Sequence, residues 1–384
     1  MIFRILEDQF AQQAKMSKAA DTRFMQLALT LGRRGQGRAW PNPAVGAVVV
    51  RDGVIVGRGW TQPGGRPHAE VEALGRAGEA ARGATLYVTL EPCSHVGRSP
   101  PCADAIIAAG IARVVSSIED PNPEVAGQGH ARLRAAGITV DIGLGAAEAA
   151  HDHAGHFRRI RDKRPHVILK LAVSSDEKIG SAGRKPVAVS GEAARTRMHL
   201  LRAQCDAILV GIGTVLSDDP LLTCRLPGMA ALSPVRVVLD RGLRIPGTSR
   251  LVHSARETLL WVMTSSLSEA PAAMKLGAAG AQVLRVATTT APPPGLDLAA
   301  VLHMLAEKGI TRLLVEGGAR VASSFVAAGL ADEVWLLRGP DAIGADGVPA
   351  LETLPLTAIT QSPDFRVRAS EALQNDTLSI YERT

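Results

Sequence analysis

Two stretches decide the fold of the first half of this chain: 68-HAEVEALGRAGEA-80 and 84-ATLYVTLEPCSHVGRSPPC-102. Residues 69–81 are rich in helix formers, so His68 is expected at a helix start. Residues 84–90 read as a buried strand, and Cys93 follows its carboxyl end, where open α/β sheets place their sites. A helix is expected from residue 103, so Cys102 stands at a helix N-terminus, where the dipole favours a thiolate.

The residue types in these stretches indicate a zinc site. His68, Cys93 and Cys102 offer one imidazole and two thiolates, which zinc binds in a tetrahedron with one position left for water. Glu70 is left over as a carboxylate that can move protons between that water, a ring nitrogen and departing ammonia. Core thiols and a structural histidine are the alternative. The complete set predicts zinc deaminase chemistry, although eight residues separate the cysteines where the usual motif has two.

His95 lies between the two cysteines. As a fourth zinc ligand it would close the site to water. We therefore interpret it as a substrate contact or a loop residue.

The composition restricts the class of protein. The chain has 384 residues, which favours two domains, each with its own core. No run of 18 apolar residues occurs, and residues 1–20 lack the apolar segment of a secretory signal, so we expect a cytoplasmic protein with no membrane partner. Of only four cysteines, Cys205 and Cys224 are expected to be ordinary thiols, as in a reducing compartment.

The net charge of +6 allows two kinds of anionic partner. Aromatic residues make up only 3% of the chain, so a stacking platform for single-stranded nucleic acid is poorly supported. A small phosphorylated substrate and a phosphorylated cofactor are favoured over nucleic acid.

The order of expected elements divides the chain into three parts. Residues 1–19 are an extension, with Met1 or Met16 as the start. Residues 20–163 alternate helices and strands as in a three-layer α/β domain, with a helix at 21–36 and a hairpin at 45–59. His151, His153 and His156 are expected on a solvated helix that leads to a linker rather than in a metal site. Residues 164–384 form a second α/β domain. Its expected strands are 166–174, 206–210, 235–240, 258–264, 282–287, 311–316, 333–338 and 377–382, and its expected helices are 192–203, 298–308 and 319–328.

Two glycine-bearing strand ends stand out in the second domain, at 210-VGIGT-214 and at 315-VEGG-318. Glycine lets backbone approach a ligand, and a helix N-terminus offers free N–H groups to phosphate. Each could equally be a tight turn, but together they suggest a nucleotide or phosphate crevice. Lys170 lies in the middle of an apolar strand, where a lysine is costly unless it meets a partner or faces a site.

These motifs together resemble the bifunctional deaminase/reductase family of riboflavin biosynthesis, over residues 20–384. The deaminase block is similar at Pro41-Asn42-Pro43, at His68-Ala69-Glu70 and from Pro92-Cys93-Ser94-His95 to Pro101-Cys102, including the spacing of the cysteines. The reductase block is similar at Lys170-Leu171-Ala172, Leu201-Arg202-Ala203, 206-DAILVG-211, 218-DDPLL-222, Arg225 and 315-VEGG-318.

The resemblance implies a cytidine-deaminase-like domain followed by a dihydrofolate-reductase-like domain. The first would deaminate 2,5-diamino-6-ribosylamino-4(3H)-pyrimidinone 5′-phosphate, and the second would reduce the ribosyl group of the product to ribityl with NADPH, in a homo-oligomer. Zn²⁺ would be bound by His68, Cys93 and Cys102, with Glu70 as proton donor. Catalysis in the second domain would use Lys170. Substrate contacts would be Asn42, Arg202, Leu222, Arg225 and Glu316. NADPH contacts would be Ala172, Thr214, Asp218, Gly318, Ala319, Arg320, Val321, Ala322, Ser323 and Ser324.

The sequence departs from this family at three positions. A common Ser-x-Trp pair falls on Pro186 and Ala188, and Glu177 replaces a common glycine. The lost pair keeps two alternatives open: a weakened reductase, or a deaminase whose second domain only scaffolds or oligomerises. A nucleic-acid-binding or nucleic-acid-editing protein is a third hypothesis, and salt-dependent binding to RNA or DNA would distinguish it.

Overall fold

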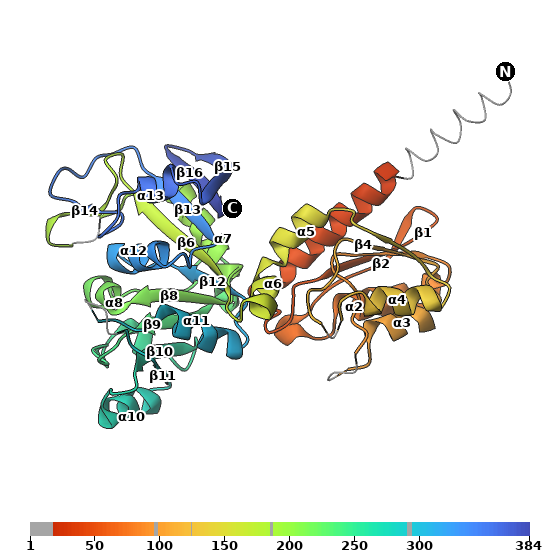
Figure 1. The fold of residues 1–384 in the computed structure, drawn as a ribbon, viewed down its shortest axis with the longest axis horizontal. Helices are drawn as coiled ribbons and strands as arrows, with labels where there is room; N and C mark the ends of the chain where they lie inside the picture. The colour runs from red at the N-terminus through yellow and green to blue at the C-terminus, as the bar shows by residue number, and fades with distance from the viewer. Residues whose placement is uncertain (1–17, 96–98, 124, 185–186, 290–293) are drawn as a thin grey trace, which may run out of the picture. The chain divides into compact units, whose positions relative to one another are not determined.

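The computed structural model describes residues 18–95, 99–123, 125–184, 187–289 and 294–384. The chain divides into two compact units, the first ending at Asp162 and the second spanning Lys163–Thr384 (Figure 1). In the described ranges, none of the helices combines the length and apolar character that crossing a membrane requires. The expected extension at residues 1–19 lies almost entirely outside the described residues.

A five-stranded mixed sheet forms the centre of the first unit, in the order β2-β1-β3-β4-β5. β1 pairs antiparallel with both β2 and β3, whereas β3, β4 and β5 run parallel. The strands are β1 (Gly46–Arg51), β2 (Val54–Trp60), β3 (Thr85–Val88), β4 (Arg113–Ser116) and β5 (Thr139–Ile142). The helices are residues 18–32, α2 (Ala69–Ala77), α3 (Cys102–Ala108), α4 (Gln128–Ala135), α5 (Ala146–Asp152) and α6 (Ala154–Arg161). Short 3₁₀ turns occupy Arg33–Gly35, Pro63–Gly65 and Gly78–Ala81.

Helices cover both faces of this sheet because successive strand residues point to opposite sides. Val49 and Leu86 belong to one buried cluster, together with side chains of α2, α3 and α4. Val48 and Tyr87 belong to another, together with side chains of α5 and of the helix at residues 18–32. This confirms the predicted three-layer α/β architecture.

The histidines before the second unit are less solvated than the sequence predicted. His153 and His156, which flank and lie in α6, are only 2% and 8% exposed. His153 Nε2 lies 3.1 Å from Thr89 Oγ1, and His156 Nε2 lies 3.1 Å from a carboxylate oxygen of Asp120. The expectation of a solvated helix is therefore wrong for these two residues, because polar partners from distant segments allow their burial.

The second unit is built on a nine-stranded sheet in the order β11-β10-β9-β8-β12-β6-β13-β16-β15. The strands are β6 (His166–Val173), β8 (Ala207–Gly211), β9 (Val235–Leu239), β10 (Leu260–Ser265), β11 (Gln282–Val286), β12 (Arg312–Val315), β13 (Glu333–Arg338), β15 (Phe365–Leu373) and β16 (Asp376–Arg383), while β7 (Lys178–Gly180) and β14 (Val348–Pro349) pair separately. The helices are α7 (Glu192–Ala203), α8 (Ile212–Asp218), α9 (Arg250–His253), α10 (Ala270–Ala278), α11 (Leu298–Glu307), α12 (Ala319–Ala327) and α13 (Thr357–Thr360), with 3₁₀ turns at Ala182–Arg184 and Ala230–Leu232.

The strands from β11 to β13 run parallel, and β16 and β15 continue the sheet antiparallel. β8 and β12 are neighbours although β9, β10 and β11 lie between them in sequence. Ligands of open α/β sheets bind outside the carboxyl ends of strands at such a reversal of order. Both glycine-bearing strand ends of the sequence therefore meet at the place where a ligand is expected.

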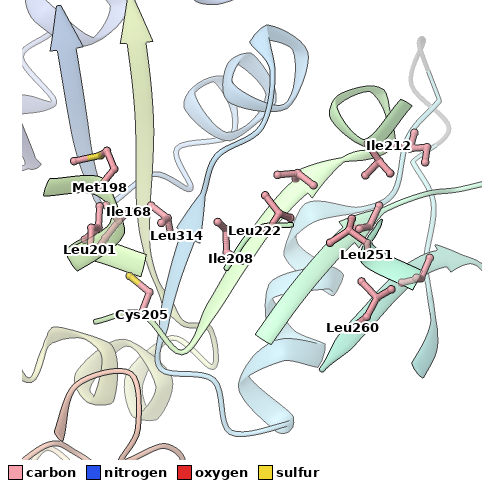
Figure 2. Close-up of a cluster of buried hydrophobic side chains, with 14 of the residues drawn as sticks. Ile168, Met198, Leu201, Cys205, Ile208, Ile212, Leu222, Leu251, Leu260 and Leu314 are labelled. Carbon is pink, nitrogen blue, oxygen red and sulfur yellow. The ribbon is translucent and has the colours of Figure 1, made fainter. Parts of the chain in front are cut away.

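One buried cluster fixes α7 against this sheet. Met198 and Leu201 of α7 pack with Ile168, Ile208 and Leu314 from three adjacent strands (Figure 2). All five are at most 7% exposed. Because the same helix carries Arg202, the core sets the position of a predicted substrate contact.

Several elements of the second unit were not predicted from the sequence, namely β7, β14, α9 and α13 as well as β15, α8 and α10. β15 has mostly exposed side chains, so its apolar pattern is too weak to mark a strand, and it is defined by pairing with β16. α8 begins at the glycines that we interpreted only as a strand end, and α10 begins with Pro271 next to its first residue.

Glu177 has a backbone φ of +65°, in the left-handed region. This conformation costs a non-glycine residue roughly 1–2 kcal/mol. The turn geometry would thus suit the glycine that the family resemblance implies at this position, and Glu177 adopts it with an ion pair to Arg338 at 3.1 Å.

Candidate functional sites

The first candidate site forms where α2 and α3 begin. His68 is the N-cap of α2, so Glu70 lies in its first turn. Cys102 is the first residue of α3, and its backbone N–H donates to Cys93 Sγ at 3.3 Å. The predicted helix starts at His68 and Cys102 are confirmed.

The three predicted metal ligands lie together. His68 Nδ1 is 3.3 Å from Cys102 Sγ and 3.7 Å from Cys93 Sγ. All three ligand atoms are within 4.8 Å of one another, and this is the one group of metal-ligating side chains found among the described residues. Hydrogen bonding from Cys102 and His68 lowers the pKa of Cys93 to about 4, against the effect of its burial, which favours the thiolate that a metal binds.

Glu70 is buried beside these ligands, with 3% of its surface exposed. Burial raises the pKa of its carboxyl group, and the neighbouring His68 acts in the opposite direction. The carboxyl group can therefore exchange protons within the site, away from bulk solvent.

Asn42 contacts the outer nitrogen of His68, with 3.1 Å between Asn42 Nδ2 and His68 Nε2. Asn42 Nδ2 also donates to the Gly65 carbonyl at 3.0 Å. The contact leaves His68 Nδ1 directed at the sulfur atoms, so Asn42 orients the imidazole ring, whether or not it also contacts the substrate.

His95 is exposed and does not belong to the three-residue group of His68, Cys93 and Cys102.

Glu91 supports the Cys93 loop, and the sequence analysis did not identify it. Its buried carboxylate accepts four backbone N–H groups, from residues 120, 127, 129 and 130, at 2.9–3.2 Å. A side chain at Gly129 would lie 2.0 Å from the carbonyl oxygen of Pro92. The segment before α4 is thus held directly against the residues that carry Cys93. The only feature of the sequence that could have indicated this role was the position of an acidic residue between a buried strand and a metal-ligand cysteine.

The chemistry of the three ligand side chains matches the preferences of zinc. One imidazole nitrogen and two thiol groups face one point, and Cys93 favours the thiolate form. Zinc prefers nitrogen and sulfur ligands and keeps an open position at catalytic sites. With three protein ligands and Glu70 adjacent, the residues fit a catalytic zinc.

The second candidate site contains a partly buried ion pair. Arg202 of α7 donates from Nε and Nη2 to the two carboxylate oxygens of Glu316, both at 2.8 Å. Glu316 follows β12, and the pKa of its carboxyl group falls to about 2 because Arg202 and Lys170 outweigh the effect of burial. Burial lowers the pKa of Lys170, while Glu316 partly compensates. The structure thus brings together three predicted site residues, Arg202, Glu316 and Lys170.

The two glycine-bearing strand ends also meet. The Thr214 hydroxyl lies 3.8 Å from the point that a Cβ on Gly318 would occupy. Gly318 is the N-cap of α12, and the first bond within this helix runs from Ala322 N–H to the Gly318 carbonyl at 3.1 Å. The N–H groups of residues 319–321 precede that bond and can bind phosphate oxygens. This arrangement fits the diphosphate of a dinucleotide.

The later part of the predicted cofactor stretch lies inside α12. Ala322 and Ser323 are buried, and Ser323 Oγ accepts the N–H of Thr353 at 3.1 Å. Val321 turns its side chain toward Gly211 and Gly317, where a Cβ would come within 2.8 Å of it. Their assignment as cofactor contacts remains a prediction.

Arg225, Leu222, Asp218 and Ala172 also lie in the second unit. Leu222 is buried with φ of +56°, whereas Arg225 is exposed. Asp218 ends α8 and accepts a hydrogen bond from Ser217 at 2.6 Å. Ala172 packs against the core cluster. Of the two departures from the Ser-x-Trp pair, Ala188 is exposed and Pro186 lies outside the described residues.

Two family models match the chain. The model of the RibD C-terminal domain matches residues 165–379, and that of the cytidine and deoxycytidylate deaminase zinc-binding region matches residues 18–118.

Curated relatives and solved structures agree with these models. The riboflavin biosynthesis protein RibD of Aquifex aeolicus is 40% identical, covering 96% of this chain and 100% of the relative. RibD of Escherichia coli is 40% identical over 91% of this chain and 95% of its own length. The structure of Acinetobacter baumannii RibD superposes with a TM-score of 0.84 at 34% identity, covering 96% of this chain and 99% of that one.

Proposed function

This chain belongs to the RibD family of riboflavin biosynthesis proteins, and we propose that its zinc group and its Arg202–Glu316 site carry the family's two reactions. It is a bifunctional deaminase/reductase with zinc and NADPH as cofactors. The matched reductase domain argues against a second unit that only scaffolds. The observation that carries the assignment is the convergence of His68, Cys93 and Cys102 within 4.8 Å beside the buried Glu70.

For the deaminase we propose 2,5-diamino-6-ribosylamino-4(3H)-pyrimidinone 5′-phosphate as substrate. His68, Cys93 and Cys102 would hold zinc, which when bound would supply a nucleophilic water near neutral pH. Glu70 would take up a proton from that water and deliver protons to the ring nitrogen and the leaving ammonia. Asn42 contacts His68 directly and so lies beside the proposed zinc site, which supports its role as a substrate contact.

For the reductase we propose that the deaminated product binds near Arg202, Leu222, Arg225 and Glu316. The start of α12, together with Thr214 and Asp218, would hold the phosphates of NADPH, which would supply the hydride that converts the ribosyl group to ribityl. Lys170 would give the proton that accompanies the hydride, since burial lowers the pKa of its ammonium group and so favours proton donation, with Glu316 acting in the opposite direction.

One assay tests both assignments. Purified protein is incubated with the diaminopyrimidinone ribotide, with and without NADPH, and ammonia release and NADPH consumption are followed separately. We expect ammonia without NADPH, and NADPH consumption only after ammonia appears. Consumption of NADPH with no preceding ammonia would contradict the proposed order.

Cys102→Ser tests the metal assignment. We expect a lower zinc content and loss of ammonia release, because a serine hydroxyl is a poor zinc ligand. Metal analysis of the purified variant measures the first effect. Cys224→Ser is the matched control, since Cys224 is a buried free thiol outside the metal group and should leave zinc unchanged. An unchanged zinc content in the Cys102 variant would refute its role as ligand.

We also propose a cytoplasmic location and a homo-oligomeric state without a nucleic-acid partner. None of the four cysteines, all of which lie in the described residues, is paired in a disulfide, which supports a reducing compartment. Light scattering measures the oligomeric state, and binding assays with RNA and DNA at low salt test the remaining alternative.

A further inference from the structure

Three side chains bind successive backbone groups of the segment 223–225. Arg202 Nη1 donates to the carbonyl of residue 223 at 3.1 Å. Ser233 Oγ accepts the N–H of residue 224 at 3.1 Å, and His199 Nδ1 accepts the N–H of Arg225 at 3.3 Å. The backbone at this point is therefore fixed by side chains rather than by pairing within a strand or helix.

His199 and Arg202 share one face of α7, because residues three apart on a helix are neighbours. Arg202 uses this face for the ion pair with Glu316, and His199 uses it for the backbone of Arg225. The guanidinium group of Arg225 has no carboxylate within ion-pair distance in the described parts of the chain, so it is available to an anionic ligand.

We propose that His199 is a positioning residue for substrate binding in the reductase. By accepting the Arg225 N–H, it holds the backbone from which the Arg225 guanidinium reaches the phosphate of the substrate. The inference rests on the proposed function, since it takes Arg225 as a substrate contact. His199 touches neither substrate nor cofactor in this arrangement and acts only through Arg225.

The charges around the imidazole support a neutral ring. The titratable and charged groups that face it are Arg202 on the same helix, Arg225 on the held segment and Glu316 after β12. The pKa of His199 is lowered by burial and by the two arginines, while Glu316 and a hydrogen bond to the backbone of Thr223 act in the opposite direction. Only a neutral imidazole has an acceptor nitrogen, so His199 can hold the Arg225 N–H at neutral pH and loses that capacity on protonation.

Two substitutions separate positioning from general stability. In His199→Asn, the amide oxygen occupies nearly the place of Nδ1 and can still accept the Arg225 N–H. In His199→Gln, the polar atoms move one bond further out. Glutamine has the higher helix propensity of the two. If His199 only stabilised α7, glutamine would therefore be the better replacement, whereas positioning predicts that asparagine is.

The measurement is reduction of supplied deaminated ribotide, with KM and kcat determined separately. We expect His199→Gln to raise KM for the ribotide about two- to tenfold, as for loss of one hydrogen bond, with KM for NADPH and ammonia release unchanged. His199→Asn should restore KM to within about twofold of the unchanged protein. Below the pKa of His199, KM of the unchanged protein should rise further than KM of His199→Asn, while titration of the substrate phosphate affects both equally.

The double variant of His199→Gln with Arg225→Ala shows whether His199 acts through Arg225. Arg225→Ala should raise KM for the ribotide strongly, and His199→Gln added to it should have almost no further effect. If Arg225→Ala leaves KM unchanged, the proposed substrate contact fails. If Arg225→Ala raises KM but His199→Gln does not, or if glutamine is better than asparagine, the positioning role is overturned while the proposed function stands.

Discussion

Glu70→Gln is expected to abolish ammonia release while zinc content and reduction of supplied intermediate stay intact. Glutamine keeps the size of the buried side chain but cannot take up and return a proton. General acid–base catalysis contributes about 10²–10⁴-fold to rate, and Glu70 would serve both proton transfers, so a loss at the upper end is expected. Because Glu70 is not among the three ligand residues, the metal should remain. Ammonia release and metal analysis on the same preparation measure both effects.

Glu72→Gln is the matched control for this variant. Glu72 also lies in the first turn of α2, but its carboxylate pairs with Arg76 at 2.9 Å on the surface. Loss of a first-turn carboxylate and a surface pair costs at most about 1 kcal/mol each. Deamination should therefore be nearly unchanged. Equal losses in the two variants would attribute the effect to the helix, and loss of both activities in Glu70→Gln would contradict independent sites.

Glu316→Ala is expected to remove reduction and to destabilise the second unit. The substitution leaves Arg202 without its ion-pair partner and removes the carboxylate that acts on Lys170. Breaking a fully buried pair on one side costs about 3–5 kcal/mol, so for this partly buried pair we expect a loss near or below the lower end of that range. Thermal unfolding measures the stability, and kcat/KM for reduction measures the activity. Ammonia release reports separately that the first unit remains folded.

The surface pair of Arg320 with Glu352 provides the control, since Arg320 is 72% exposed. Glu352→Ala should lower the free energy of unfolding by less than about 1 kcal/mol.

The pH dependence of stability provides a second test of the Arg202–Glu316 pair. The Glu316 pKa of about 2 lies below its value in an unfolded chain, so its contribution is present above the unfolded pKa and is lost as pH falls toward 2. A Glu316→Gln variant that lost stability with acid as steeply as the unchanged protein would disprove this role.

The zinc group was predictable because its chemistry depends on residue type and on helix starts that local sequence indicates. Cys102 follows two prolines, and His68 precedes a run of helix formers. Both signals are local, and both appear in the structure as predicted.

What the sequence could not show depends on contacts between distant segments. Arg202 and Glu316 were each expected to contact substrate, but their bond to one another joins residues 114 apart. The burial of His156 depends on Asp120, 36 residues away. No periodicity encodes such pairs, because they arise only when the sheet order places the segments together.

Glu91 has a consequence for how this protein handles its metal. In zinc fingers the metal is needed for folding, because the unfolded chain has no other means of gathering the ligands. Here four backbone N–H groups gather around a buried carboxylate two residues before Cys93, and none of these bonds uses the side chain of a metal ligand. The position of the backbone next to Cys93 is therefore largely set when the polypeptide folds. A chelator should strip the ion and leave a folded, reloadable apoprotein, so metal supply would govern activity rather than survival of the domain.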